Sequence, residues 1–199
     1  FTDSGKRTPS GYRIYRFNAP IHVDTPKFSS IDSTSDGVLM KWSAVKDAYK
    51  YRIYYKNRNN VWTRMAETAS TSYLDKDVKN GSSYTYTIRC VDRFGNLISD
   101  YDTTGTRHTY HLLDTPAFSR LESTPEGVKL TWNAVNNTID DTATRYRVYY
   151  KSKQYGWRMM KETTDTTFTD TDISKNSSYT YTIRCVDAKG NFVSKYNST

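Results

Sequence analysis

The chain has 199 residues and a formal net charge of +8, with 29 Lys and Arg against 21 Asp and Glu. Its mean hydropathy is low, at −0.82, but 15% of its residues are aromatic, a content that excludes a disordered chain. The sequence has no run of 18 apolar residues and no basic run longer than two, so we expect neither membrane insertion nor a nucleic-acid partner.

The first predicted element is a strand at residues 11–17, where apolar and polar residues alternate in GYRIYRF. The triplet Asp24-Thr25-Pro26 follows it, just as Asp114-Thr115-Pro116 follows a later strand-like segment, Arg107–Leu112. We therefore interpret residues 1–24 as an N-terminal segment that carries the last strand of a preceding repeat.

Three further strands are predicted in the first repeat, where apolar residues again alternate with polar ones. A period of two indicates strands with one face toward a core and the other toward water. Asn80-Gly81 and Gly95-Asn96 are turn signals between such strands. The apolar positions are Val38, Met40 and Trp42, then Tyr51, Ile53 and Tyr55, then Tyr84, Tyr86, Ile88 and Cys90.

A second repeat is evident because Ser82–Asp92 recurs unchanged as Ser177–Asp187, 95 positions later. Upstream, matching residues are only 90 positions apart, since Gly37–Val45 corresponds to Gly127–Val135. Five additional residues therefore lie in NNTIDDTATR, at 136–145. Five residues added within a strand would turn its side chains to the opposite face, so we place the insertion in the loop between the second and third strands.

The repeat predicts a first module at residues 25–113 and a second at 114–199. The first module has its own last strand at 107–112, whereas the second ends before a matching strand. We expect residues 11–17 to fill that place, either on another copy of the chain, as in a strand-exchanged oligomer, or by folding back. The chain would then be a piece of a longer array with a period of about 90 residues.

Over both modules, from about residue 26 onward, the sequence resembles the fibronectin type III family. The family pattern combines a Trp in the second strand, a Tyr-x-hydrophobic-x-Tyr in the third and a corner Tyr in the sixth. The resemblance implies an all-β fold of two tandem immunoglobulin-like sandwiches with seven strands each, the second lacking its last strand unless the N-terminal segment completes it. The residues that carry the pattern are Trp42, Tyr51–Tyr55 and Tyr84, then Trp132, Tyr146–Tyr150 and Tyr179.

The corner in the sixth strand departs from the family pattern, because neither module has its Pro. Asn176 stands at the position of Gly81, where the turn needs a left-handed backbone, a geometry that Asn tolerates. Cys90 and Cys185 take a small apolar position in the same strand. We therefore expect two buried thiols and no disulfide.

Motifs of catalysis are absent from the sequence, which has no phosphate-binding glycine loop, no Gly-x-Ser-x-Gly and no Cys-x-x-Cys. Of the three His, His22 lies in the linker, while His108 and His111 are three positions apart on a strand and so point to opposite faces. We expect no enzyme activity, no catalytic residue, no metal and no cofactor.

The acidic residues are not placed as metal ligands or as paired catalytic carboxylates would be. Asp140 and Asp141 supply only two carboxylates, whereas Ca²⁺ takes about six to eight oxygen ligands. Four others lie in repeated strand-to-turn segments, where we expect them to form turns and to be solvated: Asp75, Asp77, Asp170 and Asp172.

Aromatic residues are the candidates for a binding surface. Trp62 and Trp157 follow the third strand of each module, and an exposed Trp can stack on a sugar ring or anchor a partner. The alternative is that each Trp covers an edge of its sandwich. Tyr54 and Tyr149 lie at outward positions of the third strand. The same outward face is expected to carry Arg52, Thr87 and Arg89, with Arg147, Thr182 and Arg184 in the second module.

Three functions fit these residues. The leading hypothesis is a non-catalytic spacer or adhesion module, extracellular or at the cell surface, that links other domains of the same polypeptide and contacts proteins. The second is a carbohydrate-binding module that contacts cell-wall or host glycans through its Trp and Tyr. The third is the ancillary region of a multi-domain glycoside hydrolase. The bias toward Lys, Asn, Thr and Tyr resembles fibronectin-like repeats of Gram-positive bacterial surface and glycan-degrading proteins.

Overall fold

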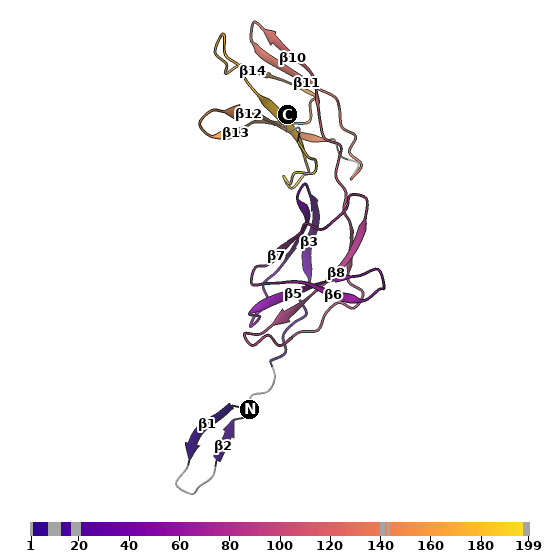
Figure 1. Ribbon diagram of the computed structural model, residues 1–199, viewed down its shortest axis with the longest axis vertical. Helices are drawn as coiled ribbons and strands as arrows, with labels where there is room; N and C mark the ends of the chain where they lie inside the picture. The colour runs from indigo at the N-terminus through magenta and orange to yellow at the C-terminus, as the bar shows by residue number, and fades with distance from the viewer. Residues whose placement is uncertain (1, 8–12, 17–20, 140–141, 143, 197–199) are drawn as a thin grey trace. The chain divides into compact units, whose positions relative to one another are not determined.

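In the computed structural model, every regular element of the described residues is a β-strand, in agreement with the predicted all-β fold (Figure 1). The structure describes residues 2–7, 13–16, 21–139, 142 and 144–196, with side chains from residue 21 onward. The antiparallel sheets form two tandem immunoglobulin-like β-sandwiches. Among the residues that the structure describes, no helix is both long enough and apolar enough to cross a membrane.

Two compact units make up the chain. The first holds most of the four-stranded sheet of the first module. The second holds the three-stranded sheet of that module together with the second module. The first unit comprises the chain up to Phe28, Trp42–Thr71 and Thr85–Thr106, and the second comprises Ser29–Lys41, Ser72–Tyr84 and the chain from Arg107.

The three-stranded sheet of the first module has the order β3-β4-β7. Val38 lies opposite Asp75 and Met40 opposite Tyr73, which places both apolar residues of β4 on the buried face. Gly37 begins β4 with a φ of 143°, and a Cβ there would lie 2.0 Å from the carbonyl oxygen of Asp75, so only glycine fits. The bounds are Phe28–Thr34 for β3, Gly37–Trp42 for β4 and Ser72–Asp75 for β7.

The four-stranded sheet of the first module has the order β6-β5-β8-β9. Tyr51 and Ile53 of β5 pair with Cys90 and Ile88 of β8, and all four side chains are buried, as the period of two predicts. The last strand, β9, is shorter than the predicted Arg107–Leu112. The bounds are Lys50–Lys56 for β5, Trp62–Thr68 for β6, Ser83–Val91 for β8 and Thr106–Thr109 for β9.

In the second module the sheets have the orders β10-β11-β14 and β13-β12-β15. Tyr146 lies opposite Cys185 just as Tyr51 lies opposite Cys90, so the register of the first module is kept. The five extra residues fall between β11 and β12, in a loop, as predicted. The bounds are Phe118–Thr124 for β10, Gly127–Trp132 for β11, Arg145–Ser152 for β12, Gly156–Thr163 for β13, Thr167–Asp170 for β14 and Tyr181–Val186 for β15.

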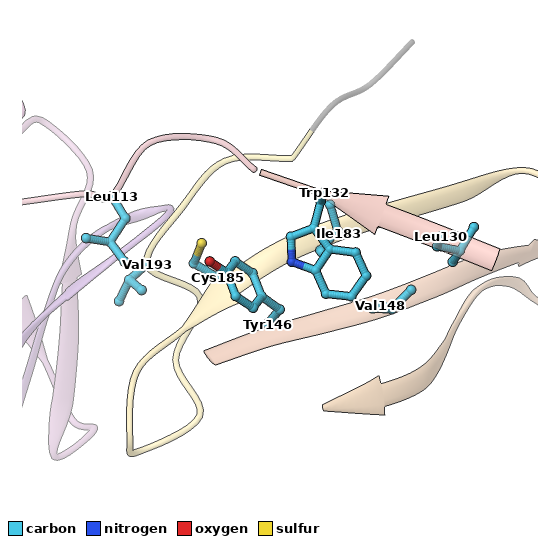
Figure 2. Close-up of a cluster of buried hydrophobic side chains, with 8 residues drawn as sticks. All are labelled: Leu113, Leu130, Trp132, Tyr146, Val148, Ile183, Cys185 and Val193. Carbon is cyan, nitrogen blue, oxygen red and sulfur yellow. The ribbon is translucent and has the colours of Figure 1, made fainter. Parts of the chain in front are cut away.

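Figure 2 shows the core of the second module, where side chains from β11, β12 and β15 converge. Trp132 packs edge-to-face against Tyr146, with ring centroids 5.6 Å apart. Full burial of an aliphatic side chain stabilises a fold by roughly 1.5–3 kcal/mol, so this cluster carries much of the module's stability. Both cysteines are buried and free, as predicted. The cluster consists of Leu113, Leu130, Trp132, Tyr146, Val148, Ile183, Cys185 and Val193.

The tyrosine corners form in both modules. The hydroxyl of Tyr84 accepts a hydrogen bond from the backbone N–H of Lys79 at 2.8 Å. The hydroxyl of Tyr179 accepts one from the N–H of Ser174 at 2.6 Å. Asn176 has a φ of 59°, which confirms that it takes the left-handed turn position.

At the N-terminus, β2 (Arg13–Arg16) pairs with β1 (Thr2–Arg7), a strand that the sequence patterns did not predict. Residues 11, 12 and 17 of the predicted strand lie outside the described residues. Among the described residues no strand takes the place next to β15 that β9 takes next to β8. Completion of the second module by residues 11–17, either from another copy or by folding back, therefore stays a prediction.

Asp75 and Asp170 correct one expectation, because both are buried rather than solvated. The carboxylate of Asp75 accepts a hydrogen bond from the N–H of Asp77 at 3.0 Å. That of Asp170 accepts one from the N–H of Asp172 and another, at 2.8 Å, from the hydroxyl of Tyr181. These aspartates therefore form the predicted turns while their side chains lie within the fold.

Candidate functional site

One cavity in each module is lined by the aromatic residues singled out in the sequence. The two cavities, which we call the first and second cradle, measure about 120 and about 200 Å³. Every residue of the first cradle recurs 95 positions later in the second, which adds Phe192. The first cradle is lined by Tyr54, Trp62, Thr87, Arg89 and Tyr101, and the second by Tyr149, Trp157, Thr182, Arg184, Phe192 and Tyr196.

Strand pairing positions these side chains. Tyr54 of β5 lies opposite Thr87 of β8, and Lys56 lies opposite Trp62 of β6. Alternate residues of neighbouring strands share a face, so the three strands present the cradle on the face away from the core. Tyr101 comes from the loop that follows β8 and was not predicted from the sequence as a site residue. The match of Tyr101 with Tyr196 at the repeat distance could have revealed it.

Trp62 is enclosed in the first cradle. Its ring meets that of Tyr101 edge-to-face, with centroids 6.3 Å apart, and the Nζ of Lys56 lies 4.9 Å from its centroid. A Cβ at Gly105 would lie 2.5 Å from the Cη2 of Trp62, so the backbone there touches the indole.

Arg89 anchors the loop that forms the side of the first cradle. Its Nε and Nη2 donate hydrogen bonds of 3.1 and 2.8 Å to the carbonyl oxygen of Ser99. Its guanidinium carbon lies 5.2 Å from the ring centroid of Tyr101. Thr87 lies on this outward face of the sheet, yet its side chain is buried because the loop after β8 covers it. Its hydroxyl donates to the carbonyl oxygen of Asp102 at 2.9 Å.

In the second cradle, Arg184 lies between two rings. Its guanidinium carbon is 3.7 Å from the centroid of Phe192 and 5.2 Å from that of Tyr196. Its Nη2 donates to the carbonyl oxygen of Ser194 at 3.2 Å and to the hydroxyl of Ser35, in the same compact unit, at 2.7 Å. Burial lowers the pKa of Arg184. Thr182 also lies on the outward face and is buried, like Thr87 in the first cradle.

Trp157 and Tyr149 also line the second cradle, and each has its own neighbours there. Trp157 is 39% exposed, and the Nζ of Lys151 lies 5.8 Å from its ring centroid. The ring of Tyr149 lies 6.4 Å from that of Phe192. The structure thus brings each predicted Trp and Tyr together in one cavity, with an arginine beneath the rings.

Arg52 and Arg147, also expected on this face, are held by carboxylates of the neighbouring strand. Arg52 forms an ion pair with Glu67 at 2.9 Å, and Arg147 forms one with Glu162 at 2.7 Å. The hydrogen bond from Arg52 lowers the pKa of Glu67, and that from Arg147 lowers the pKa of Glu162. These two arginines therefore strengthen the pairing of β5 with β6 and of β12 with β13.

The histidines singled out in the sequence have polar partners elsewhere. Nε2 of His108 lies 2.9 Å from the hydroxyl of Ser33, and burial lowers the pKa of His108. Nε2 of His111 lies 2.6 Å from the hydroxyl of Thr138. Within the described residues no three His, Cys, Asp or Glu side chains gather as metal ligands would. Residues 140 and 141 lie outside that part.

The fold, two tandem sandwiches with a tyrosine corner in each, is similar to that of fibronectin type III domains. The chain is 28% identical over 179 residues to exoglucanase B of Cellulomonas fimi and 27% identical over 175 residues to chitinase A1 of Niallia circulans. Each alignment covers 83% of this chain, which spans only 16% and 23% of the lengths of these two relatives.

The crystal structure of the FN1–FN3 domains of chicken CNTN1 has the same fold, with a TM-score of 0.58. It is 10% identical to this chain, and the superposition covers 96% of this chain and 73% of that structure. At this identity the likeness concerns the fold alone. No family model matches the sequence.

Proposed function

We propose that this chain is the non-catalytic ancillary region of a larger extracellular glycan-degrading enzyme, in which it spaces and presents the other domains. One observation carries the proposal: both modules align with segments of two enzymes whose names state different activities, an exoglucanase and a chitinase. A segment shared by enzymes of different substrates is a poor candidate for the part that cleaves the glycan.

The cradles support a mechanical role. In each module an arginine of the sixth strand fixes the following loop through a serine carbonyl, Ser99 or Ser194, while aromatic rings pack on the guanidinium. Cation–π contacts contribute about 0.5–2 kcal/mol each, depending on their desolvation. These contacts make the sheet face that carries each cradle more rigid. A stiff module keeps neighbouring domains apart better than a flexible linker of equal length.

The experiment uses the full-length protein in three forms: intact, with residues 21–196 deleted, and with these residues replaced by an unrelated pair of immunoglobulin-like modules. A spacer predicts equal turnover of a short soluble oligosaccharide by all three. On an insoluble polysaccharide, the deletion lowers activity and the replacement restores the part of it that depends on spacing.

Two results would contradict the proposal. The first is a deletion that lowers activity on the soluble substrate as much as on the insoluble one. The modules would then belong to the catalytic unit. The second is a full-length protein without glycan-degrading activity, which would favour the role of a cell-surface adhesion module with protein partners.

A further inference from the structure

The second cradle differs from the first by two substitutions that make its surroundings more apolar. Arg64 of the first module corresponds to Met159 of the second, and Leu97 corresponds to Phe192. Arg64 forms an ion pair with Glu67 at 3.1 Å, whereas Met159 is 57% exposed. These differences lie within the described residues and do not depend on the segment that covers Trp62.

Strand register places the apolar residues side by side. Met159 lies opposite Tyr149, and Trp157 lies opposite Lys151, so all four share one face of β12 and β13. Trp157, Phe192 and Tyr196 line the cavity beside them, and Tyr196 is 46% exposed. The face therefore combines ring surfaces with an exposed thioether, a composition that marks interaction sites.

The charged groups of this face already have partners. Arg184 binds the carbonyl oxygen of Ser194 between two rings, and Arg147 is paired with Glu162. Lys151 lies beside the ring of Trp157. Lys151 is exposed and keeps its charge, but the two arginines are bound within the protein, so most of the face is flat apolar surface, which suits a neutral ligand.

We propose that the second cradle, with Met159 at its edge, binds a chain of β-1,4-linked pyranose sugars by stacking, and that the first cradle does not. The C–H faces of such sugars are flat and apolar, so they match aromatic platforms in shape and chemistry. Glucose and N-acetylglucosamine polymers share this geometry. This inference rests on the proposed function, because it names the substrate class that the ancillary region contacts.

The test is depletion of the 199-residue chain from solution by regenerated cellulose and by colloidal chitin, with the affinity taken from binding isotherms. Trp157→Ala is expected to weaken binding about tenfold. Met159→Arg, which introduces the residue found in the first module, is also expected to weaken binding. Both side chains are exposed, so both variants are expected to fold, as thermal unfolding will show.

Trp62→Ala is the matched control, since it removes the corresponding residue from the enclosed first cradle, and its affinity is expected to equal that of the wild type. Absence of wild-type binding to both polymers overturns the inference, as does an equal loss in Trp62→Ala and Trp157→Ala. Binding to one polymer alone supports it and identifies the sugar. A failed binding test leaves the spacer role intact, because that role is judged by the module-replacement experiment.

Discussion

At the scale of single residues, Gly105 holds the first cradle closed. Its φ is 76°, and an added Cβ would lie within 3.0 Å of three atoms, among them Cη2 of Trp62. We expect Gly105→Ala to lower the free energy of unfolding by about 2–4 kcal/mol, through backbone strain and overpacking together. Urea denaturation measures the loss.

Gly95→Ala is the matched control for this prediction. Gly95 has a φ of 88° but nothing within 4 Å of the added Cβ, so only backbone strain applies, about 1 kcal/mol. Equal losses in both variants would show that the contact with Trp62 has no energetic weight.

Cys185 provides a pH prediction. Burial raises the pKa of its thiol from 9.0 to about 11, so the folded state keeps the proton longer than the unfolded state. The stabilisation is complete below pH 9 and is lost between pH 9 and about 11, by up to about 2–3 kcal/mol. Unfolding free energies of the wild type are therefore expected to fall more steeply over this range than those of Cys185→Ala. Parallel curves would contradict the prediction.

At the scale of elements, the tyrosine corners fix how β8 and the sixth strand of the second module begin. Tyr84→Phe and Tyr179→Phe each remove a hydroxyl that accepts a backbone hydrogen bond. We expect each to cost about 0.5–1.5 kcal/mol, seen as a lower urea midpoint. Tyr155→Phe, at a side chain that is 61% exposed, is the control and is expected to change stability by less than about 0.5 kcal/mol. A control as costly as the corner variants would refute the role of the corner hydroxyls.

The strands of both modules could be predicted because the alternation of apolar residues is a local signal. Asn176 could be predicted as well, since a left-handed turn restricts which residues fit. The burial of Thr87 could not, because it depends on how the loop after β8 folds back over the sheet. The hairpin of β1 with β2 was missed because residues 2–7, TDSGKR, lack an alternating pattern.

In the candidate site, the Trp and Tyr of β5, β6, β12 and β13 were found from residue type and position on a strand. Tyr101 and Tyr196 were missed because they lie in loops, where no periodicity indicates the direction of a side chain. The closure of the cradle around Trp62 depends on Gly105, which lies 43 positions away in sequence. Such contacts become visible only when the sheets are assembled.

At the scale of the whole molecule, the net charge of +8 acts separately from the cradles. Scattered positive charge attracts polyanions in a salt-dependent way, whereas stacking on neutral sugars does not depend on screening. We expect adsorption to carboxymethylcellulose to disappear between about 0.05 and about 0.5 M NaCl, while binding to regenerated cellulose changes by less than about twofold. Equal salt sensitivity on both materials would assign the binding to charge alone.

The loop between β11 and β12 has one further consequence. The two modules are versions of one framework in which this connection differs by five residues, yet Tyr51–Cys90 and Tyr146–Cys185 keep the same pairing. The connection therefore tolerates five additional residues without a change in the register of the strands that flank it. The connection is accordingly a natural attachment point for a fluorescent label or an affinity tag, through which the modules can be followed on a polysaccharide surface.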